Sequence, residues 1–214
     1  MSHTFILVED QPLVRDNLLA QLKSQYPDAK VLPTGVAEGV EEMVSKANPD
    51  LIIMDLSIPF DAEAKATYAT GIALIERLLR EHTDINFAVR SVDPKNLVRL
   101  KREIENHNAG FVIIDKALPE KDILERIDWA LKGVNYTREI RGGPELKKEW
   151  KTVLHLAFNE ALTDEAIAQE MNLAIRTVRV YWSKAQDALE IYPDKRYNRR
   201  IQTYNKVRQL GFLD

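Results

Sequence analysis

Three carboxylates stand directly after short apolar runs early in the chain, where they could share a metal ion. Glu9 and Asp10 follow the run Thr4–Val8, and Asp55 follows the run Leu51–Met54. Carboxylates brought close together repel each other unless a cation lies among them. Oxygen ligands of this kind suit Mg²⁺, which binds through a few carboxylates together with water and phosphate oxygens. These residues therefore predict a Mg²⁺ site at which Asp55 acts as a nucleophile toward a phosphoryl donor.

Two more polar residues follow later apolar runs in the same way. Ser91 lies just beyond the run at 86–89, and Lys116 lies just beyond the run at 111–114. A Lys side chain that reaches the carboxylates would pair with phosphate oxygens. The hydroxyl of Ser91 could hydrogen-bond the same phosphoryl group once it is attached.

The elements that must position these residues alternate between strand and helix. Apolar β-rich runs predict strands at 4–8, 30–32, 51–54, 86–89 and 111–114, and helical stripes predict helices at 13–25, 36–47, 71–81, 94–106 and 120–132. Strict alternation indicates right-handed crossovers, a parallel sheet and helices on both faces. Such sheets bind ligands outside the carboxyl ends of their strands, where the polar residues fall. We predict an α/β domain with a five-stranded parallel, doubly wound (flavodoxin-like) sheet.

The segments FILVED and LIIMDLSIP, followed in order by Ser91 and Lys116, resemble the receiver domain of two-component response regulators. The resemblance covers roughly residues 4–132. It implies Mg²⁺-dependent phosphorylation of Asp55 by a histidine kinase. It assigns the ion to Glu9, Asp10, Asp55 and the backbone carbonyl of Ser57, the switch hydroxyl to Ser91, and the phosphate contact to Lys116.

Several features depart from the receiver pattern. Residues 60–70 are inserted before Gly71, and this insertion could lie over the site. Ala117 follows Lys116 where proline is usual, and the spacing from Gly110 to Lys116 is longer than usual. These departures keep two alternatives open: a receiver that is regulated without phosphate, and an unrelated flavodoxin-like sheet whose carboxylates are only solvated.

Composition changes in the second part of the chain. Residues 1–132 contain 16 Lys and Arg against 22 Asp and Glu, whereas residues 176–208 contain 9 against 3. Glycines and a proline make residues 133–144 the predicted linker, and strand patterns disappear from residue 145 onward. We predict a receiver domain at 1–132 and an all-α domain at 145–214.

A helix-turn-helix pattern occupies residues 162–189. Thr163 is suited to cap its first helix, and Asn172 to adopt the left-handed conformation of the turn. The inner face of the second helix has Val178, Trp182, Ala185 and Leu189 at helical spacing. The pieces LTDEAIA and RTVRVYWSK resemble the output domain of LuxR/NarL-type regulators over roughly residues 146–191, although Ala174 stands where a capping Ser or Thr is common. A generic three-helix bundle is the alternative.

The outward face of the second helix is the predicted DNA-binding surface. Arginine on an exposed helix can bind guanine edges in the major groove, and helix N-terminal amides and hydroxyls can hold phosphates. The residues expected on this face are Arg176, Thr177, Arg179, Val180, Ser183 and Lys184.

A basic helix is predicted at 195–210. We expect Ile201, Tyr204 and Leu210, together with Phe212, to pack on the bundle. The basic face would then either contact phosphates or only cap the domain.

Composition limits the function further. Cysteine is absent, which excludes disulfides and thiolate metal sites and fits a cytoplasmic protein, and no apolar run approaches the length of a membrane span. We predict a transcription factor that binds double-stranded DNA as a homodimer, under the control of a histidine kinase. A signalling adaptor whose helical domain binds protein is the second hypothesis. An enzyme is disfavoured because no glycine-rich phosphate loop is present.

Overall fold

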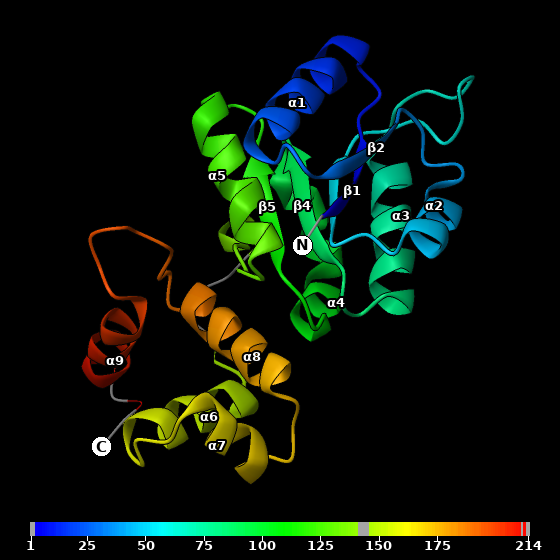
Figure 1. Ribbon diagram of the computed structural model, residues 1–214. Helices are drawn as coiled ribbons and strands as arrows, with labels where there is room; N and C mark the ends of the chain where they lie inside the picture. Colours follow the sequence, from blue (N-terminus) through cyan, green and yellow to red (C-terminus); the bar gives the residue numbers. More distant parts are fainter. Residues whose placement is uncertain (1–2, 141–145, 211, 213–214) are drawn as a thin grey trace.

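The computed structural model describes residues 3–140, 146–210 and 212, and it contains an α/β domain followed by an all-helical domain (Figure 1). The described part of the first domain has one parallel sheet with the strand order β2-β1-β3-β4-β5. This arrangement confirms the predicted flavodoxin-like fold class. The strands are β1 (Thr4–Val8), β2 (Lys30–Thr34), β3 (Leu51–Asp55), β4 (Asn86–Ser91) and β5 (Phe111–Asp115).

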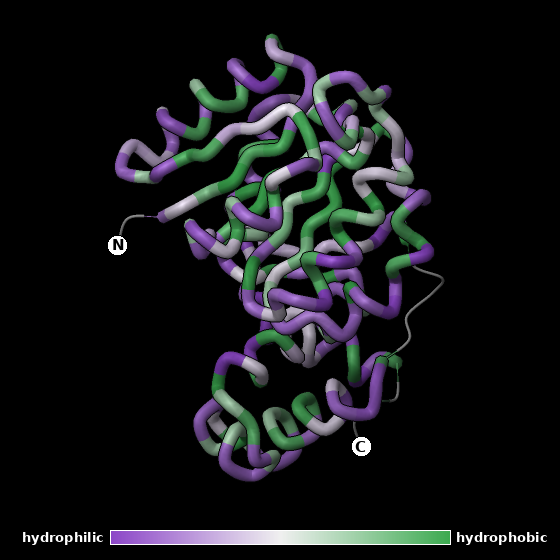
Figure 2. The backbone as a smooth tube through the Cα atoms, turned by 90° about the vertical axis from the view of Figure 1, so that its right-hand side faces the viewer, coloured by the Kyte–Doolittle hydropathy of each residue, from purple (hydrophilic) through white to green (hydrophobic). Residues whose placement is uncertain are grey.

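Helices cover both faces of this sheet. Helices α1 (Pro12–Gln25) and α5 (Glu120–Leu131) lie on one face. The opposite face carries α2 (Val40–Ala47), α3 (Tyr68–Glu81), the 3₁₀ helix η1 (Pro94–Leu100) and α4 (Lys101–Asn106). Because both faces are covered, the inner strands β1 and β3 are buried and largely apolar, and Figure 2 shows a green, hydrophobic centre of the sheet. The helix predicted at 36–47 is shorter than expected, and the one predicted at 94–106 is divided into η1 and α4.

The second domain contains α6 (Lys148–Phe158), α7 (Asp164–Glu170), α8 (Ile175–Ala188) and α9 (Arg199–Gln209). Thr163 caps α7 by accepting a hydrogen bond from the backbone N–H of Ala166, as predicted. Asn172 has a φ of 52°, so it provides the left-handed residue of the turn before α8. Among the described residues, every helix is too short or too polar to span a bilayer.

The predicted packing of the C-terminal helix holds for Tyr204, whose ring lies 5.4 Å from that of Phe158 in α6, and is wrong for Ile201 and Leu210. Ile201 is 60% exposed and Leu210 is 41% exposed. Thr203 and Val207 instead face the bundle and are fully buried. The helix begins later than predicted, because the Asn198 side chain accepts hydrogen bonds from the first backbone N–H groups of α9.

The first part of the predicted linker follows the sheet edge. Tyr136 lies beside β5, where its N–H donates to the Phe111 carbonyl and its carbonyl accepts from the N–H of Ile113, both at 2.9 Å. The 3₁₀ helix η2 (Arg138–Ile140) follows. The remainder of the predicted linker, 141–144, lies outside the described residues. Residues 134–137 are therefore held by hydrogen bonds to β5 and, as shown below, to α8.

Candidate functional site

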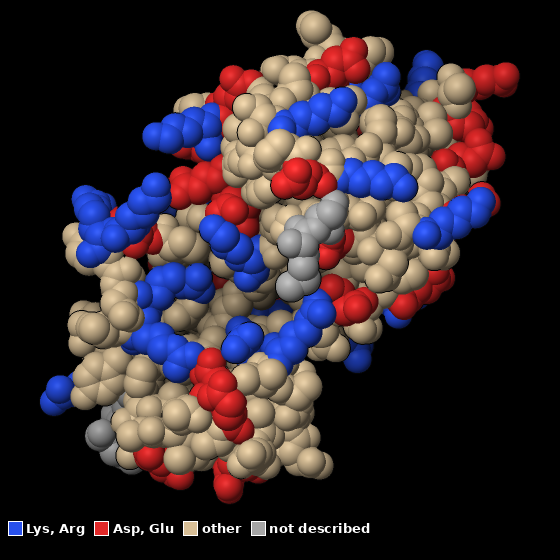
Figure 3. Space-filling model, viewed as in Figure 1, with Lys and Arg blue, Asp and Glu red and all other residues tan. Residues whose placement is uncertain are grey.

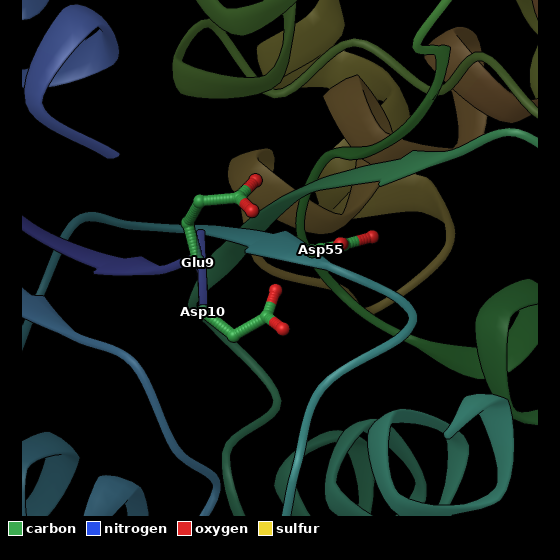
Figure 4. A group of neighbouring side chains, drawn as sticks. All are labelled: Glu9, Asp10 and Asp55. Atoms are coloured by element: carbon green, nitrogen blue, oxygen red, sulfur yellow. The ribbon is translucent and has the colours of Figure 1, made fainter. Parts of the chain in front are cut away.

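Three carboxyl groups surround a common space at the carboxyl ends of β1 and β3 (Figure 4). Glu9 and Asp10 directly follow β1, and Asp55 is the last residue of the neighbouring strand β3. One oxygen from each of the three lies within 4.8 Å of the others. Glu9 and Asp55 are buried, whereas Asp10 is half-buried. The fold therefore brings together the carboxylates that the sequence predicted as metal ligands.

The lysine predicted to contact phosphate reaches this cluster. The Nζ atom of Lys116 lies 2.5 Å from Oδ2 of Asp55 and 4.0 Å from Oε2 of Glu9. Side chains two positions apart in a strand lie on the same face of the sheet. Ile53 and Ile114 share one face, so Asp55 and Lys116, each two residues later, point to the same side. The unusual spacing before Lys116 therefore does not prevent its contact with Asp55.

Ser91 and Ser57, which were predicted to contact the phosphoryl group and the metal ion, have other hydrogen-bond partners in this structure. The hydroxyl of Ser91, which is fully buried, accepts a hydrogen bond from the N–H of Asp93 at 3.0 Å. The backbone N–H of Ser57 donates to Oδ1 of Asp55 at 3.2 Å. Within the described residues, no contact joins the Ser91 hydroxyl to Asp55.

The sequence reasoning missed one charged residue at this site, Arg90. It pairs with Asp55 in the register of β3 and β4, and its guanidinium donates to Oε2 of Glu9 at 2.9 Å. The Arg90 side chain is 7% exposed, and its Nε atom is buried with no partner. An arginine within a strand that is covered on both faces is unusual, because buried arginines require a partner. That signal, in the segment NFAVRS, could have identified it.

Burial and charge act against each other at this site. Burial raises the pKa of Glu9 above its ordinary value, Lys116 lowers it, Asp55 raises it and Arg90 lowers it. Burial also lowers the pKa of the Arg90 guanidinium, while Glu9 opposes this shift. Three carboxylates thus face two cations. One oxygen of Asp10, Oδ1, is buried and has no hydrogen-bond partner. An orphaned carboxylate oxygen beside two other carboxylates fits a hard divalent cation such as Mg²⁺.

Arg90→Met should strengthen Mg²⁺ binding, because it removes a positive charge that competes for Glu9. We expect the dissociation constant for Mg²⁺ to fall about tenfold, since like charges in a partly buried site repel strongly. Isothermal titration calorimetry with MgCl₂ measures this change. Arg99→Met, which removes an exposed arginine of η1, should leave the affinity within about twofold because exposed charges are screened. An Mg²⁺ affinity that is unchanged or weaker in Arg90→Met would contradict this electrostatic account.

The insertion after β3 pairs with the loop between β2 and α2. The carbonyls of Pro59 and Phe60 accept hydrogen bonds from the N–H groups of Ala37 and Glu38. Thr67 returns to pair with Ile58 and caps α3. The hydrogen bonds described for this loop therefore connect it to 37–38, and none of them reaches the acidic cluster.

The predicted DNA-binding face is partly covered by the first domain. Arg176 and Arg179 are exposed and Thr177 is half-buried, but Val180, Ser183 and Lys184 are 6%, 6% and 3% exposed. The expectation that all six residues face outward is wrong in this conformation. The reason is the packing of the C-terminal half of α8 against the first domain.

Lys184 makes the most extensive of these contacts. Its ammonium group donates to the carbonyls of Ile104, Glu105 and His107 at 3.0, 2.6 and 2.5 Å. These carbonyls lie at the C-terminal end of α4, where the partial negative charge of the helix favours a cation. Lys184 therefore both caps α4 and holds α8 against it.

Further hydrogen bonds join α8 to the first domain and to residues 134–137. The Ser183 hydroxyl accepts from the N–H of Asn135 at 2.7 Å. Asp187 accepts from the N–H and the hydroxyl of Thr137 at 3.1 and 2.8 Å. At the other end of α8, Arg176 donates to the carbonyl of Asp84 at 2.6 Å. Helix α8 is thus docked along its length.

Acid should destabilise this region through His107, whose ring contacts the carbonyl of Ile85 at 2.7 Å. Burial lowers the pKa of His107 to about 4, and the nearby charges of Lys184 and Arg176 lower it further. The hydrogen bond to Ile85 and the charge of Asp84 oppose this shift. Since the unfolded histidine titrates near its model value of 6.5, the unfolded chain binds more protons between these pH values. The free energy of unfolding should therefore fall by about 2 kcal/mol between pH 7 and pH 5 on account of this group.

Urea unfolding of His107→Gln at both pH values tests this effect. The variant keeps a hydrogen-bond donor toward Ile85 but cannot titrate, so it should lose about 2 kcal/mol of the pH dependence. His155→Gln, which changes an exposed histidine of α6, should retain it. Equal pH dependence in wild type and His107→Gln would refute the assignment.

Comparison with known proteins bears on the fold. No protein-family model matches the chain, and no curated protein sequence matches it. Several solved structures match the chain. A structure that contains two RcsB dimers bound to two parallel DNAs is 20% identical to it, with a TM-score of 0.51, and the match covers 97% of this chain and 100% of that chain. A complex of the two-component response regulator RcsB with DNA is 21% identical, with a TM-score of 0.51 and the same coverage.

A third structure is RcsB from Salmonella enterica serovar Typhimurium bound to the promoter P1flhDC in the presence of phosphomimetic BeF₃⁻. It is 21% identical, with a TM-score of 0.51, and covers 97% of this chain and 100% of that chain. At these identities the likeness concerns the fold: the chain shares with RcsB a parallel receiver-type domain followed by a helical domain.

Proposed function

We propose that this chain is a DNA-binding response regulator in which Asp55 accepts a phosphoryl group from a histidine kinase. The observation that carries the proposal is the cluster in which Asp55 lies 2.5 Å from Lys116 and within 4.8 Å of two further carboxylates. The RcsB structures, which are bound to DNA and in one case were obtained in the presence of phosphomimetic BeF₃⁻, support the same interpretation. Their assembly as dimers supports a homodimer on duplex DNA.

In the proposed chemistry, an oxygen of Asp55 attacks the phosphorus of a phosphohistidine. The new O–P bond forms as the N–P bond breaks, and the imidazole nitrogen keeps the electron pair and takes up a proton. A bound Mg²⁺, held by Glu9, Asp10, Asp55 and the Ser57 carbonyl, would neutralise charge on the transferring group. Lys116, which now pairs with Asp55, would pair with a phosphoryl oxygen, and Ser91 would exchange its bond to Asp93 for one to the phosphoryl group.

DNA recognition by the whole face of α8 requires the two domains to separate. Val180, Ser183 and Lys184 are buried against the first domain, whereas Arg176 and Arg179 are exposed. We infer that phosphorylation shifts the population from this docked state toward one in which α8 is free. Arg179 would then contact bases, and Thr177 and Arg176 would contact phosphates.

Arg179→Ala should weaken binding to a specific duplex by about 10- to 100-fold, since a bidentate arginine contributes about 1–3 kcal/mol of base discrimination. Arg179 is exposed, so the fold should be unaffected. Gel-shift titrations at two salt concentrations measure the loss and its salt dependence. Arg208→Ala, an exposed arginine of α9, is the matched control and should change binding less than about twofold. Similar losses in both variants would remove Arg179 from base recognition.

One observation favours a second candidate, a receiver regulated without phosphate. The buried pair of Arg90 and Glu9 already neutralises one of the three carboxylates. A site that carries its own cations depends less on a divalent ion to remain folded. This candidate predicts that Asp55→Asn retains normal control of DNA binding.

A further inference from the structure

A basic cleft lies between the two domains, beside the docked recognition helix. Its volume is about 490 Å³, and it is bounded by the end of α5 and by α8 and α9. Figure 3 shows Lys and Arg side chains gathered around a hollow at this boundary. The five cations that line it are Lys132, Arg176, Arg179, Arg199 and Arg200. No Asp or Glu is among its described lining residues.

Only two of these cations have a carboxylate partner among the described residues. Lys132 pairs with Asp128 and Arg200 with Asp164, both at 2.6 Å. The remaining three guanidinium groups, of Arg176, Arg179 and Arg199, form no ion pair with a described residue. The cleft therefore carries a concentrated positive charge that the described part of the chain does not balance.

Arg199 shows the cost of this imbalance most clearly. Its guanidinium donates to the side-chain carbonyl of Gln186, but its Nε atom is buried and has no partner. Burial lowers the pKa of Arg199, and no carboxylate opposes that shift. A half-buried charge without a counter-charge is unfavourable, and a bound anion would offset this cost.

We propose that this cleft binds a small molecule carrying two or more phosphoryl groups. Three unpaired guanidinium groups on two helices match several phosphoryl groups better than one, because each arginine fork binds phosphate oxygens bidentately. A volume of about 490 Å³ lies in the range of small-molecule sites. Leu131, Val134 and Trp182 add apolar lining that can contact the organic part of the ligand.

Such a ligand would hold the recognition helix in its docked position. Val180 and Ser183 of α8 line the same cleft as Asn86 and Lys132 of the first domain. A molecule bound between them contacts both domains and therefore favours the docked state over the separated one. This consequence rests on the proposed DNA-binding function, whereas ligand binding itself does not.

The test is calorimetric titration of the full chain with inorganic tripolyphosphate, without DNA and without divalent ions. We expect saturable binding of one tripolyphosphate per chain. Arg199→Gln should raise the dissociation constant at least about tenfold, which corresponds to about 1.4 kcal/mol. Arg208→Gln, an exposed arginine of α9 outside the cleft, should raise it less than about twofold.

Arg179→Gln is a second test variant, used in case Arg199→Gln does not fold. Arg179 is exposed and forms no ion pair with a described residue, so its replacement should leave the fold intact. We expect it to weaken binding about fivefold, in keeping with one lost charge-assisted contact. Absent saturable binding, or equal losses in the cleft variants and Arg208→Gln, would overturn the proposal. The titration contains no DNA, so evidence of tripolyphosphate binding would stand even if the chain did not bind duplex DNA.

Discussion

Acetyl phosphate and Mg²⁺ should add one phosphoryl group to the wild-type chain and none to the Asp55→Asn variant. Asp55 is the carboxylate that Lys116 contacts at 2.5 Å, and it lies beside Glu9 and the orphaned oxygen of Asp10. An amide at this position keeps the shape but is a poor nucleophile and a weak cation ligand. We expect the initial rate of labelling to fall at least about 100-fold, as on loss of a catalytic nucleophile. Intact-protein mass spectrometry measures the added group.

Asp93→Asn is the control for this experiment. Asp93 lies just beyond Ser91 but is exposed and outside the acidic cluster, so the variant should be labelled at close to the wild-type rate. Labelling that persists in Asp55→Asn would show that the acceptor lies elsewhere. An equal loss of labelling in Asp55→Asn and Asp93→Asn would indicate that both substitutions disturb the loops at the carboxyl ends of the strands.

Lys184→Ala should separate the two domains. The substitution removes three charge-assisted hydrogen bonds to the end of α4 and leaves the carbonyls of Ile104, Glu105 and His107 without that donor. We expect the docked state to lose about 2–3 kcal/mol, the value of hydrogen bonds to charged groups. Small-angle X-ray scattering should show a larger radius of gyration and longer interdomain distances. DNA affinity is a poor measure here, because Lys184 is also a proposed DNA contact.

Lys148→Ala serves as the matched control, since it removes an exposed lysine from α6 in the same domain. Its scattering profile should match that of the wild type. A Lys184→Ala profile that also matches would mean that the docked arrangement does not depend on this contact.

The part of the fold that depends on local patterns could be predicted from the sequence. Strands β1, β3 and β5 are apolar, buried runs, and the alternation of strands with helices predicted a parallel sheet whose carboxyl ends bring Glu9, Asp55 and Lys116 together. The cap at Thr163 and the left-handed Asn172 were predicted because short polar side chains favour these conformations. These signals act within a few residues, so no partner element had to be known.

Features that depend on contacts between distant segments were not predicted. Lys184 looked like an outward-facing DNA contact because the helical period alone cannot show that α4 will cover it. Arg90 was not assigned a role, because the predicted run ended at Val89 and its partner Glu9 lies 81 positions away. Ile201 and Leu210 of α9 were misassigned because the sequence pattern did not show that Thr203 would face Gln186 of α8. In each case the deciding interaction lies outside the local pattern.

The most direct test of the central claim is a gel shift of the full chain on genomic promoter fragments, with and without beryllium fluoride and Mg²⁺. If Asp55 is the proposed phosphoryl acceptor, beryllium fluoride bound there would take the place of the phosphoryl group and should release α8 from the first domain. We predict that the apparent dissociation constant falls at least about tenfold, or about 1.4 kcal/mol, in the wild type and not in Asp55→Asn. Duplex binding that is the same with and without beryllium fluoride, or that never rises above a salt-sensitive background, would contradict the account.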